Sequence, residues 1–303
     1  MQEWQTTSFP NCNMFHELDF STKSVTNQFE YYTSGGYNDI FYLDEKDKPD
    51  DPALAMKILQ YGTDYSDRNF DRVRRDSVIL ERLTKSPYVL NLFGFCGFDV
   101  LTPYADGGTL SSKLRKWGQG KLKLSPMTRL QYAVDAALGL AAVHDIDGEG
   151  LSSVTHGDLK GQQYLFLNGE MKLGDFNRGR FMRRNSTAPH TACTYTIGKN
   201  DATFRSPEEY EYLPQTSAID VYALGSILYE ILNGKEVWHS IHSNDARKRI
   251  RKGLLPKLSS SDEPVDTALR EAIAMCYVFD PKDRAKAADV ASFLKQKLSE
   301  IST

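Results

Sequence analysis

Hydrophobic positions fall into short runs in the first third of the chain and into longer, periodic segments after that. Short runs rich in aromatic and β-branched residues predict β-strands within 29–43, 53–59, 88–97 and 98–104. Gly35 and Gly36 interrupt the first run, which predicts two strands joined by a turn, and the polar run 44–51 predicts an exposed hairpin tip. Between the strands, residues 68–83 carry apolar side chains at three- and four-residue spacing, which predicts one helix.

The rest of the chain has mainly helical periodicity. Amphipathic or continuously apolar segments predict helices at 125–145, 217–234, 268–279 and 286–298. Ser125 and Pro126 suit the start of the first of these, and Gly234 suits the end of the second. A strand-rich part followed by a helical part predicts an α+β fold with an N-terminal extension (1–28), a small lobe (29–103) and a larger lobe (104–303).

Composition narrows the class of protein. The 303 residues are 40% hydrophobic and 25% charged, so a sizeable core is expected. The net charge of −3 gives no sign of a basic surface that would bind nucleic acid. No run approaches the ~18 apolar residues of a membrane-spanning helix, and the first fifteen residues do not resemble a secretory signal. The four cysteines are Cys12, Cys96, Cys193 and Cys276. Their spacing matches neither a metal site nor a dense disulfide framework. These features favour a cytoplasmic location, alone or as the cytosolic part of a longer membrane protein.

The richest chemical signal is the stretch HGDLKGQQYLFLNGEMKLGDFNRGRF, residues 156–181. Asp158 in a loop, an amide at Gln163 and a second carboxylate at Asp175 suit phosphoryl transfer. In that chemistry one aspartate orients a hydroxyl and accepts its proton. The oxygen atoms of the amide and of the second aspartate are ligands that Mg²⁺ prefers.

This stretch resembles the catalytic core of eukaryotic protein kinases, with its H-R-D-L-x-x-x-x-N and D-F-G motifs. The resemblance implies that Asp158 is the catalytic aspartate, that Gln163 and Asp175 bind Mg²⁺, and that Lys160 steadies the transferring group as in serine/threonine kinases. The runs LFGFCG and PYADGGTL are similar to the tyrosine-kinase-like group. The implied fold is a two-lobed protein kinase fold, with a small antiparallel sheet and one helix above a mainly helical lobe.

Other kinase elements follow in the expected order. Lys57, in Ala-Met-Lys on the third strand, matches the phosphate-binding lysine, and Asp76 stands where its glutamate partner is expected. Glu208 in FRSPEEY is expected to pair with Arg284, and Asp220 is expected to brace the catalytic loop. His144 and His190 have no predicted partner.

The resemblance implies that ATP binds between the lobes. Ile40 and Ala55 would form the roof of the adenine pocket, Thr102 would guard its rear, and the backbone of 103–105 would supply hydrogen bonds. The predicted nucleotide-binding residues are Gly35, Gly36, Ile40, Ala55, Lys57, Thr102, Tyr104 and Ala105.

The chain departs from the family pattern at several positions. Only the middle glycine of the phosphate loop is kept, within residues 33–38, and Asn177 replaces the last glycine of D-F-G. Asp76 is one methylene shorter than glutamate, and Gln163 is longer than asparagine. Gly157 replaces the arginine that normally binds a phosphorylated activation loop, so activity is expected to depend less on such phosphorylation. None of these changes removes a charge that the reaction needs.

Three functions are compatible with this pattern. The first is a protein kinase that transfers the γ-phosphate of Mg-ATP to serine or threonine hydroxyls of protein substrates. The second is a pseudokinase that acts as a scaffold and binds nucleotide weakly or not at all. A kinase acting on small molecules ranks last, because such enzymes usually lack the Ser-Pro-Glu segment and its arginine partner.

Overall fold

The structure, a computed structural model, describes Glu3, Trp4, Cys12, Phe15 and Leu18 and the ranges 29–43, 53–184, 192–197 and 202–302. The chain divides into two compact units. The strand-rich unit comprises Gln2–Gly107 and Leu165–Gly179, and the helical unit comprises Gly108–Tyr164 and Arg180–Thr303, with Met1. Residues 165–179 thus belong to the strand-rich unit, although the sequence analysis counted them in the larger lobe.

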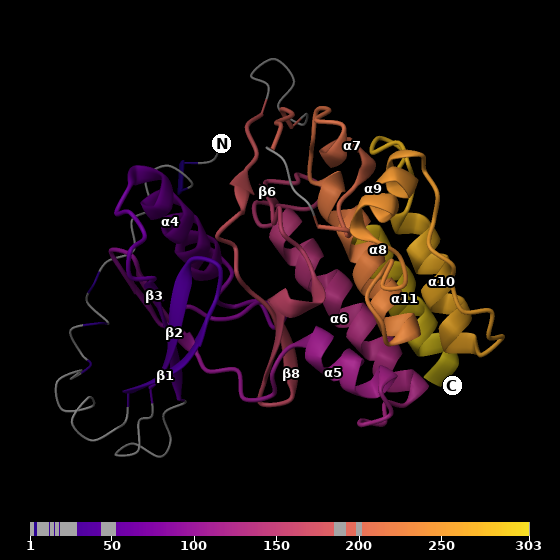
Figure 1. Cartoon of the computed structure of the whole chain (residues 1–303), viewed down its shortest axis with the longest axis horizontal. Helices are drawn as coiled ribbons and strands as arrows, with labels where there is room; N and C mark the ends of the chain where they lie inside the picture. The colour runs from indigo at the N-terminus through magenta and orange to yellow at the C-terminus, as the bar shows by residue number, and fades with distance from the viewer. Residues whose placement is uncertain are drawn as a thin grey trace. The chain divides into compact units, whose positions relative to one another are not determined.

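One antiparallel sheet forms the core of the strand-rich unit (Figure 1). Its strands, in chain order, are β1 (Phe29–Ser34), β2 (Asn38–Leu43), β3 (Leu54–Leu59), β4 (Gly94–Cys96) and β5 (Asp99–Pro103). They are arranged in the spatial order β1-β2-β3-β5-β4. Helix α4 (Asp67–Arg82) is capped at its start by Ser66, whose side chain accepts a hydrogen bond from the backbone N–H of Asn69.

The two faces of the sheet bury different sets of side chains because successive residues of a strand point to opposite faces. On one face, Leu54 and Met56 of β3 pack with Leu43, Leu101 and Phe15. The other face carries Val100 and Phe95, which pack against Val73 of α4. Lys57 lies opposite Val100 in the register and therefore shares the face that α4 covers.

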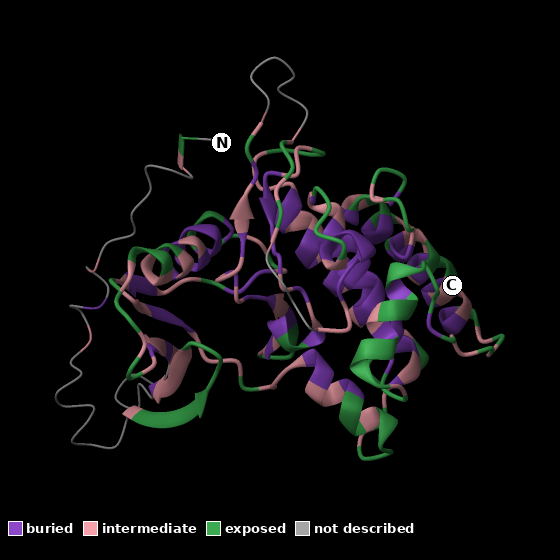
Figure 2. Cartoon of the chain, turned by 45° about the horizontal axis from the view of Figure 1, so that its top comes forward, coloured by how far each residue is buried: buried purple, intermediate pink, exposed green. Residues whose placement is uncertain are grey.

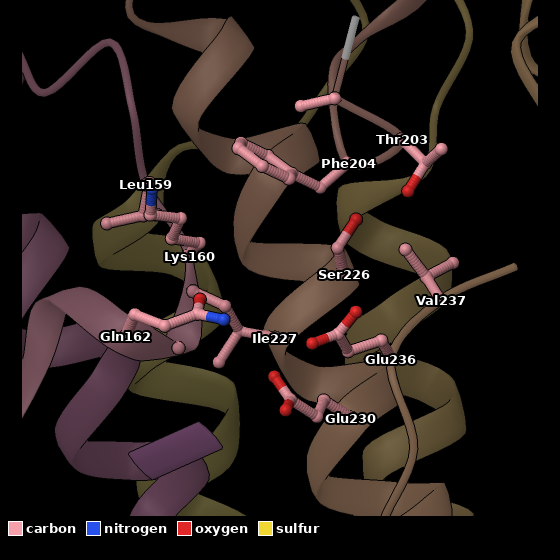
Figure 3. Close-up of a pocket in the computed structure, with 12 residues that line it drawn as sticks. Leu159, Lys160, Gln162, Thr203, Phe204, Ser226, Ile227, Glu230, Glu236 and Val237 are labelled. Atoms are coloured by element: carbon pink, nitrogen blue, oxygen red, sulfur yellow. The ribbon is translucent and has the colours of Figure 1, made fainter. Parts of the chain in front are cut away.

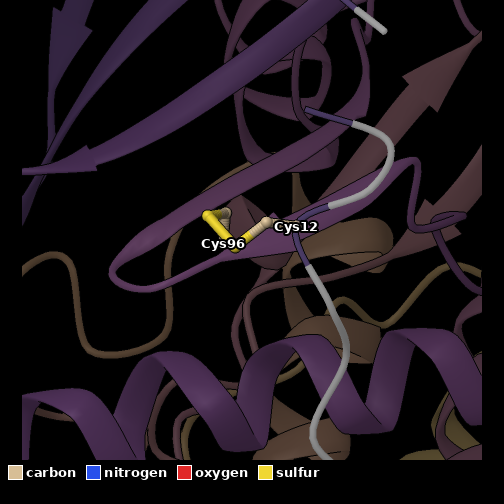
Figure 4. Close-up of a disulfide and its surroundings, with 2 residues drawn as sticks. All are labelled: Cys12 and Cys96. Atoms are coloured by element: carbon tan, nitrogen blue, oxygen red, sulfur yellow. A yellow bond between two sulfur atoms is a disulfide. The ribbon is translucent and has the colours of Figure 1, made fainter. Parts of the chain in front are cut away.

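A disulfide between Cys12 and Cys96 links the N-terminal segment to the end of β4, across 84 residues of sequence (Figure 4). The backbone N–H of Phe15 donates to the carbonyl of Cys12, and its ring is buried against the sheet. Among the described residues, Cys193 and Cys276 are free thiols. The sequence analysis did not find this disulfide, because a separation of this length carries no spacing signal.

The helical unit is built around two long helices, α6 (Pro126–His144) and α8 (Ala218–Asn233). The other helices are α5 (Leu110–Gly118), α7 (Pro207–Tyr210), α9 (Ser243–Arg251), α10 (Pro264–Cys276) and α11 (Ala287–Ser302). Helix α6 packs against α11, α8 and α10, and burial is concentrated in the central helices of the unit (Figure 2). As predicted, the Ser125 hydroxyl caps α6 by accepting from the N–H of Thr128, and Gly234 ends α8 with φ of 65°.

The secondary structure differs from expectation in two places. The run 88–97 is a strand only at Gly94–Cys96; before it, the N–H of Leu90 donates to the carbonyl of Leu173. Two small sheets were not predicted, and they pair β6 (Val154–Thr155) with β9 (Arg180–Phe181) and β7 (Tyr164–Leu167) with β8 (Glu170–Leu173). The predicted tip 44–51 and His190 lie outside the described residues. Of the helices described, none has the length and apolar character needed to cross a bilayer.

Candidate active site

The register of the sheet gathers four predicted nucleotide-binding residues on one face. Ile40 of β2 lies opposite Lys57 of β3, and Ala55 of β3 lies opposite Thr102 of β5. Residues opposite one another in a ladder share a face, as do residues two apart in a strand. The side chains of Ile40, Ala55, Lys57 and Thr102 therefore line the face of the sheet that α4 covers.

Lys57 is paired with Asp76 of α4. Its Nζ lies 3.2 Å from Oδ2 of Asp76, so the shorter side chain of aspartate reaches the lysine. The other carboxylate oxygen of Asp76 accepts a hydrogen bond of 2.6 Å from the backbone N–H of Phe176. Burial opposes the charged form of Lys57, but the carboxylates of Asp76 and Asp175 outweigh it and raise the lysine's pKa. The ammonium is therefore held in its charged form next to two acidic groups.

Asp175 lies directly before the fully buried ring of Phe176 and has a φ of 64°, in the left-handed region. Its Oδ1 accepts a hydrogen bond of 2.6 Å from the side-chain amide of Asn177, the residue that replaces the usual glycine. One oxygen of Asp175 is thus engaged within the loop. Asn177 orients this carboxylate in addition to providing the backbone turn.

Two of the predicted nucleotide contacts lie where β5 ends. The N–H of Tyr104 donates to the carbonyl of Ala53 at 2.8 Å, so this amide is already used within the sheet. A hydrogen bond to Tyr32, with burial as a smaller cause, raises the pKa of the Tyr104 hydroxyl to about 12. Because the backbone N–H of Tyr104 is already used, we expect the backbone N–H of Ala105 to be the one that contacts the nucleotide.

Gly35 and Gly36 form the turn between β1 and β2. The N–H of Gly35 donates to the carbonyl of Asn38 at 2.8 Å, and the side-chain amide of Gln60 donates to the carbonyl of Gly35. A Cβ at Gly36 would meet no heavy atom within 4 Å. Among the residues that the structure describes, no hydrogen bond joins Gly35 or Gly36 to Lys57. The turn itself does not require glycine at position 36.

In the helical unit, both carboxylate oxygens of Asp158 are engaged by cations. Lys160 Nζ lies 3.2 Å from Oδ2, and the guanidinium of Arg205 forms an ion pair with Oδ1. Lys160 lies only two residues after Asp158 in the chain. The sequence analysis did not predict the contact with Arg205, which lies 47 residues further along the chain.

Asp220 of α8 braces the loop that carries Asp158, as predicted. Its two carboxylate oxygens accept hydrogen bonds from the backbone N–H groups of His156 and Gly157 at 2.7 and 2.9 Å. The ring Nε2 of His144 also lies 3.0 Å from Asp220. The expectation that His144 has no partner is therefore wrong; the missed signal is its place at the end of a buried helix.

Two further predictions concern this unit. Gln163 is buried in the short 3₁₀ helix Gly161–Gln163, directly after Lys160. The expected ion pair between Glu208 and Arg284 is confirmed, with two contacts of 2.7 and 3.2 Å between buried side chains. This pair ties α7 to the segment that precedes α11.

A cavity of about 220 Å³ lies next to Lys160 in the helical unit (Figure 3). It is bounded by Gln162, Phe204 and the end of α8, and the side chains of Glu230 and Glu236 lie along its wall. Burial raises the pKa of Glu230 to about 7, although a hydrogen bond from the Ser111 hydroxyl acts in the opposite direction. The cavity is acidic, and the sequence analysis did not single out either glutamate.

Oxygen ligands suited to Mg²⁺ are present in both units. Asp175 offers a carboxylate and Gln163 an amide oxygen, the donor types that Mg²⁺ binds. Among the described residues, no group of three or more histidine, cysteine or acidic side chains could hold a metal ion. Each of these donors would suit a magnesium ion that is held largely by substrate phosphates.

The predicted site residues form two sets. In the strand-rich unit, direct contacts or sheet register bring together Ile40, Ala55, Lys57, Asp76, Thr102 and Asp175. In the helical unit, Asp158 and Lys160 are in contact and Gln163 follows in the same loop. Arg205 joins the second set, and sequence reasoning did not find it.

Comparison with known proteins agrees with this geometry. The family model described as protein kinase domain matches residues 34–294. The chain is 24% identical over 268 residues to the probable serine/threonine-protein kinase gdt8 of Dictyostelium discoideum, covering 82% of this chain and 18% of that protein. It is 26% identical over 200 residues to the serine/threonine-protein kinase VIK of Arabidopsis thaliana, covering 65% of this chain and 43% of that protein. It is 23% identical over 274 residues to the serine/threonine-protein kinase STY46 of Arabidopsis thaliana, covering 88% of this chain and 43% of that protein.

The chain therefore belongs to the protein kinase domain family. Its antiparallel sheet with helix α4 and its helical unit make up the α+β fold of that family, as predicted. The predicted resemblance to serine/threonine-type kinases near the tyrosine-kinase-like group is confirmed by these relatives. The chain spans less than half the length of each of them.

Proposed function

We propose that this chain is an active protein serine/threonine kinase that transfers the γ-phosphate of Mg-ATP to protein hydroxyls. The observation that carries the proposal is the ion pair of Lys57 with Asp76, beside Asp175, at 3.2 Å. A lysine held charged next to the predicted metal-binding aspartate is what phosphate binding in this family requires. The names of the relatives support serine or threonine as the acceptor.

In this proposal Lys57 binds the α- and β-phosphates, and Asp175 and Gln163 provide oxygen ligands for Mg²⁺. When bound, the ion neutralises charge that develops on the γ-phosphate. Asp158 orients the acceptor hydroxyl and accepts its proton, while the hydroxyl oxygen bonds to the γ-phosphorus. The bond from that phosphorus to the bridging oxygen breaks, and its electron pair leaves with ADP. Lys160 stabilises the transferred group by charge, and catalysis is mainly positioning and electrostatics.

The remaining predicted nucleotide contacts belong to the same proposal. Ile40 and Ala55 cover the adenine ring, Thr102 lies behind it, and the segment with Tyr104 and Ala105 supplies backbone hydrogen bonds. Gly35 and Gly36 cover the phosphates, and the open space around Gly36 permits close approach there. A cytoplasmic location also remains a prediction.

The acidic cavity beside Lys160 supports a finer proposal about the substrate. Glu230 and Glu236 favour a cationic side chain close to the acceptor residue. A basic protein is therefore a suitable first substrate. Transfer from labelled ATP with Mg²⁺ to serine or threonine of that protein is expected, with Asp158→Asn as the control. Equal labelling of the basic protein by wild type and by Asp158→Asn would contradict the proposal.

A second candidate function is a pseudokinase scaffold. It is favoured by the loop at 33–38, which keeps one of the three family glycines, and by Asn177, whose amide engages Asp175. Against it, the lysine and both aspartates that the chemistry needs are all present. Thermal denaturation separates the two, because a ligand that binds the folded state raises the midpoint. A midpoint raised by Mg-ATP without any phosphate transfer would favour a nucleotide-binding scaffold.

A further inference from the structure

Arg205 lies next to Asp158 and is almost completely buried, with 2% of its surface exposed. It precedes Ser206, the residue that caps α7. A buried guanidinium requires anionic or carbonyl partners, because its desolvation is costly. Its partners therefore indicate what Arg205 is built to contact.

Three groups fix the position of the guanidinium. Its Nη1 donates to the carbonyl of Gly157 at 2.6 Å and to Oε1 of Glu209 at 3.1 Å. The carbon at the centre of the guanidinium lies 4.9 Å from the centre of the Phe204 ring. The planar fork of arginine can make these contacts while Nη2 meets Asp158. The guanidinium is thus held in place independently of Asp158.

Gly157 explains why this arrangement is possible. Its φ of 73° lies in the left-handed region, where glycine is favoured. Position 157 contributes its carbonyl to Arg205 and carries no side chain of its own. The cation on Oδ1 of Asp158 therefore comes from Arg205, 47 residues further along the chain, and not from the residue that precedes Asp158.

We propose that Arg205 is a positioning residue for Asp158 in the phosphate transfer, an inference that rests on the proposed function. With Lys160 on Oδ2 and Arg205 on Oδ1, the carboxylate is restrained at both oxygens. Each carboxylate oxygen has two acceptor sites, so an oxygen that is paired can still accept from a substrate hydroxyl. Arg205 fixes the orientation of the Asp158 carboxylate toward the substrate hydroxyl. In this role it acts through Asp158 and not on the reacting atoms themselves.

The test compares Arg205→Met and Arg205→Lys with wild type. Small errors in positioning cost about 100-fold in rate. We therefore expect Arg205→Met to lower kcat about 30- to 100-fold and to leave the KM for ATP within about twofold, because the nucleotide contacts lie elsewhere. Arg205→Lys keeps the charge but loses the fork, so its kcat should lie between those of Arg205→Met and wild type. The matched control is Arg249→Met, an exposed arginine of α9 that should keep the wild-type rate.

A structural role for Arg205 must be separated from a positioning role, because Arg205 also neutralises Glu209. Glu209→Gln leaves the Arg205–Asp158 contact in place and should keep kcat within about threefold. In an Asp158→Asn background, Arg205→Met should change the residual rate less than about twofold, since residues that act as a unit are not additive. The same fold-loss in both backgrounds would show that Arg205 only supports the fold.

The possible failures are distinguishable. If wild type transfers no phosphate, the proposed function fails and this role of Arg205 fails with it. If wild type is active and Arg205→Met matches it, only the inference about Arg205 is overturned. Should Arg205→Met not fold, as judged by its thermal midpoint, Arg205→Lys decides: an unchanged kcat would overturn the inference.

Discussion

The carboxylate of Asp76 does the work of the longer glutamate expected at its position. It reaches Lys57 at 3.2 Å and also accepts from the N–H of Phe176. Because its side chain is buried, there is little room for an extra methylene. Asp76→Asn keeps the shape but removes the charge, so we expect kcat/KM for ATP to fall about 10- to 100-fold. Asp76→Glu should not raise kcat/KM for ATP above the wild-type value.

Steady-state kinetics with varied ATP measure both Asp76 variants. Their thermal midpoints are the control for folding. Wild-type kcat/KM in Asp76→Asn would mean that the pair with Lys57 does not serve nucleotide binding. A clear gain in Asp76→Glu would mean that the pair in this chain is too short.

The ionisation of Glu230 makes stability depend on pH. Burial raises its pKa in the folded state to about 7, above the ordinary value, so the folded form retains a proton that the unfolded chain releases. The stabilisation from this proton is present at low pH and is lost as pH rises through about 7. A shift of this size corresponds to about 3 kcal/mol. As pH rises from 5 to 8, the unfolding free energy of Glu230→Gln should therefore fall less than that of wild type.

Chemical denaturation at several pH values across that range tests this prediction. The difference in unfolding free energy between wild type and Glu230→Gln should change with pH. A constant difference would show that Glu230 does not titrate there. Glu271→Gln, at an exposed position of α10, is the matched control.

At the scale of elements, the Cys12–Cys96 disulfide attaches the N-terminal segment to the sheet. Phe15, close to Cys12 in the chain, packs with Leu54 and Met56 on the face of the sheet that α4 does not cover. Closing a loop of 84 residues constrains the unfolded chain and is typically worth about 2–4 kcal/mol. We expect Cys96→Ser to lower the thermal midpoint by about 5–10 °C.

Differential scanning calorimetry with and without a dithiol reductant measures this effect. The reductant should lower the midpoint of wild type and leave that of Cys96→Ser unchanged. Cys193→Ser removes an exposed free thiol and is the control. If wild type melts at the same temperature in oxidising and reducing buffer, the disulfide does not stabilise the fold.

Local signals in the sequence predict most of the elements and several of the site contacts. Ser125 and Gly234 mark helix ends because caps act on neighbouring residues. The alternation along β3 predicts which residues share a face with Lys57. By contrast, the Cys12–Cys96 bond and the Arg205–Asp158 contact join distant positions. No periodicity or cap predicts such pairs, because they depend on how the chain folds back on itself.

At the scale of the whole molecule, each unit carries one part of the predicted machinery. Lys57, Asp76 and Asp175 belong to the strand-rich unit, and Asp158 and Lys160 belong to the helical unit. The proposed function requires both sets of residues for one reaction. It predicts that Lys57→Met and Asp158→Asn abolish the same reaction although they alter different units.

The most direct measurement is transfer of labelled phosphate from ATP, with Mg²⁺, to a basic protein. Wild type is predicted to label serine and threonine at least about 100-fold faster than either Lys57→Met or Asp158→Asn. Phosphoamino-acid analysis of the product identifies the acceptor. Labelling by wild type that does not exceed that of both variants would contradict the account.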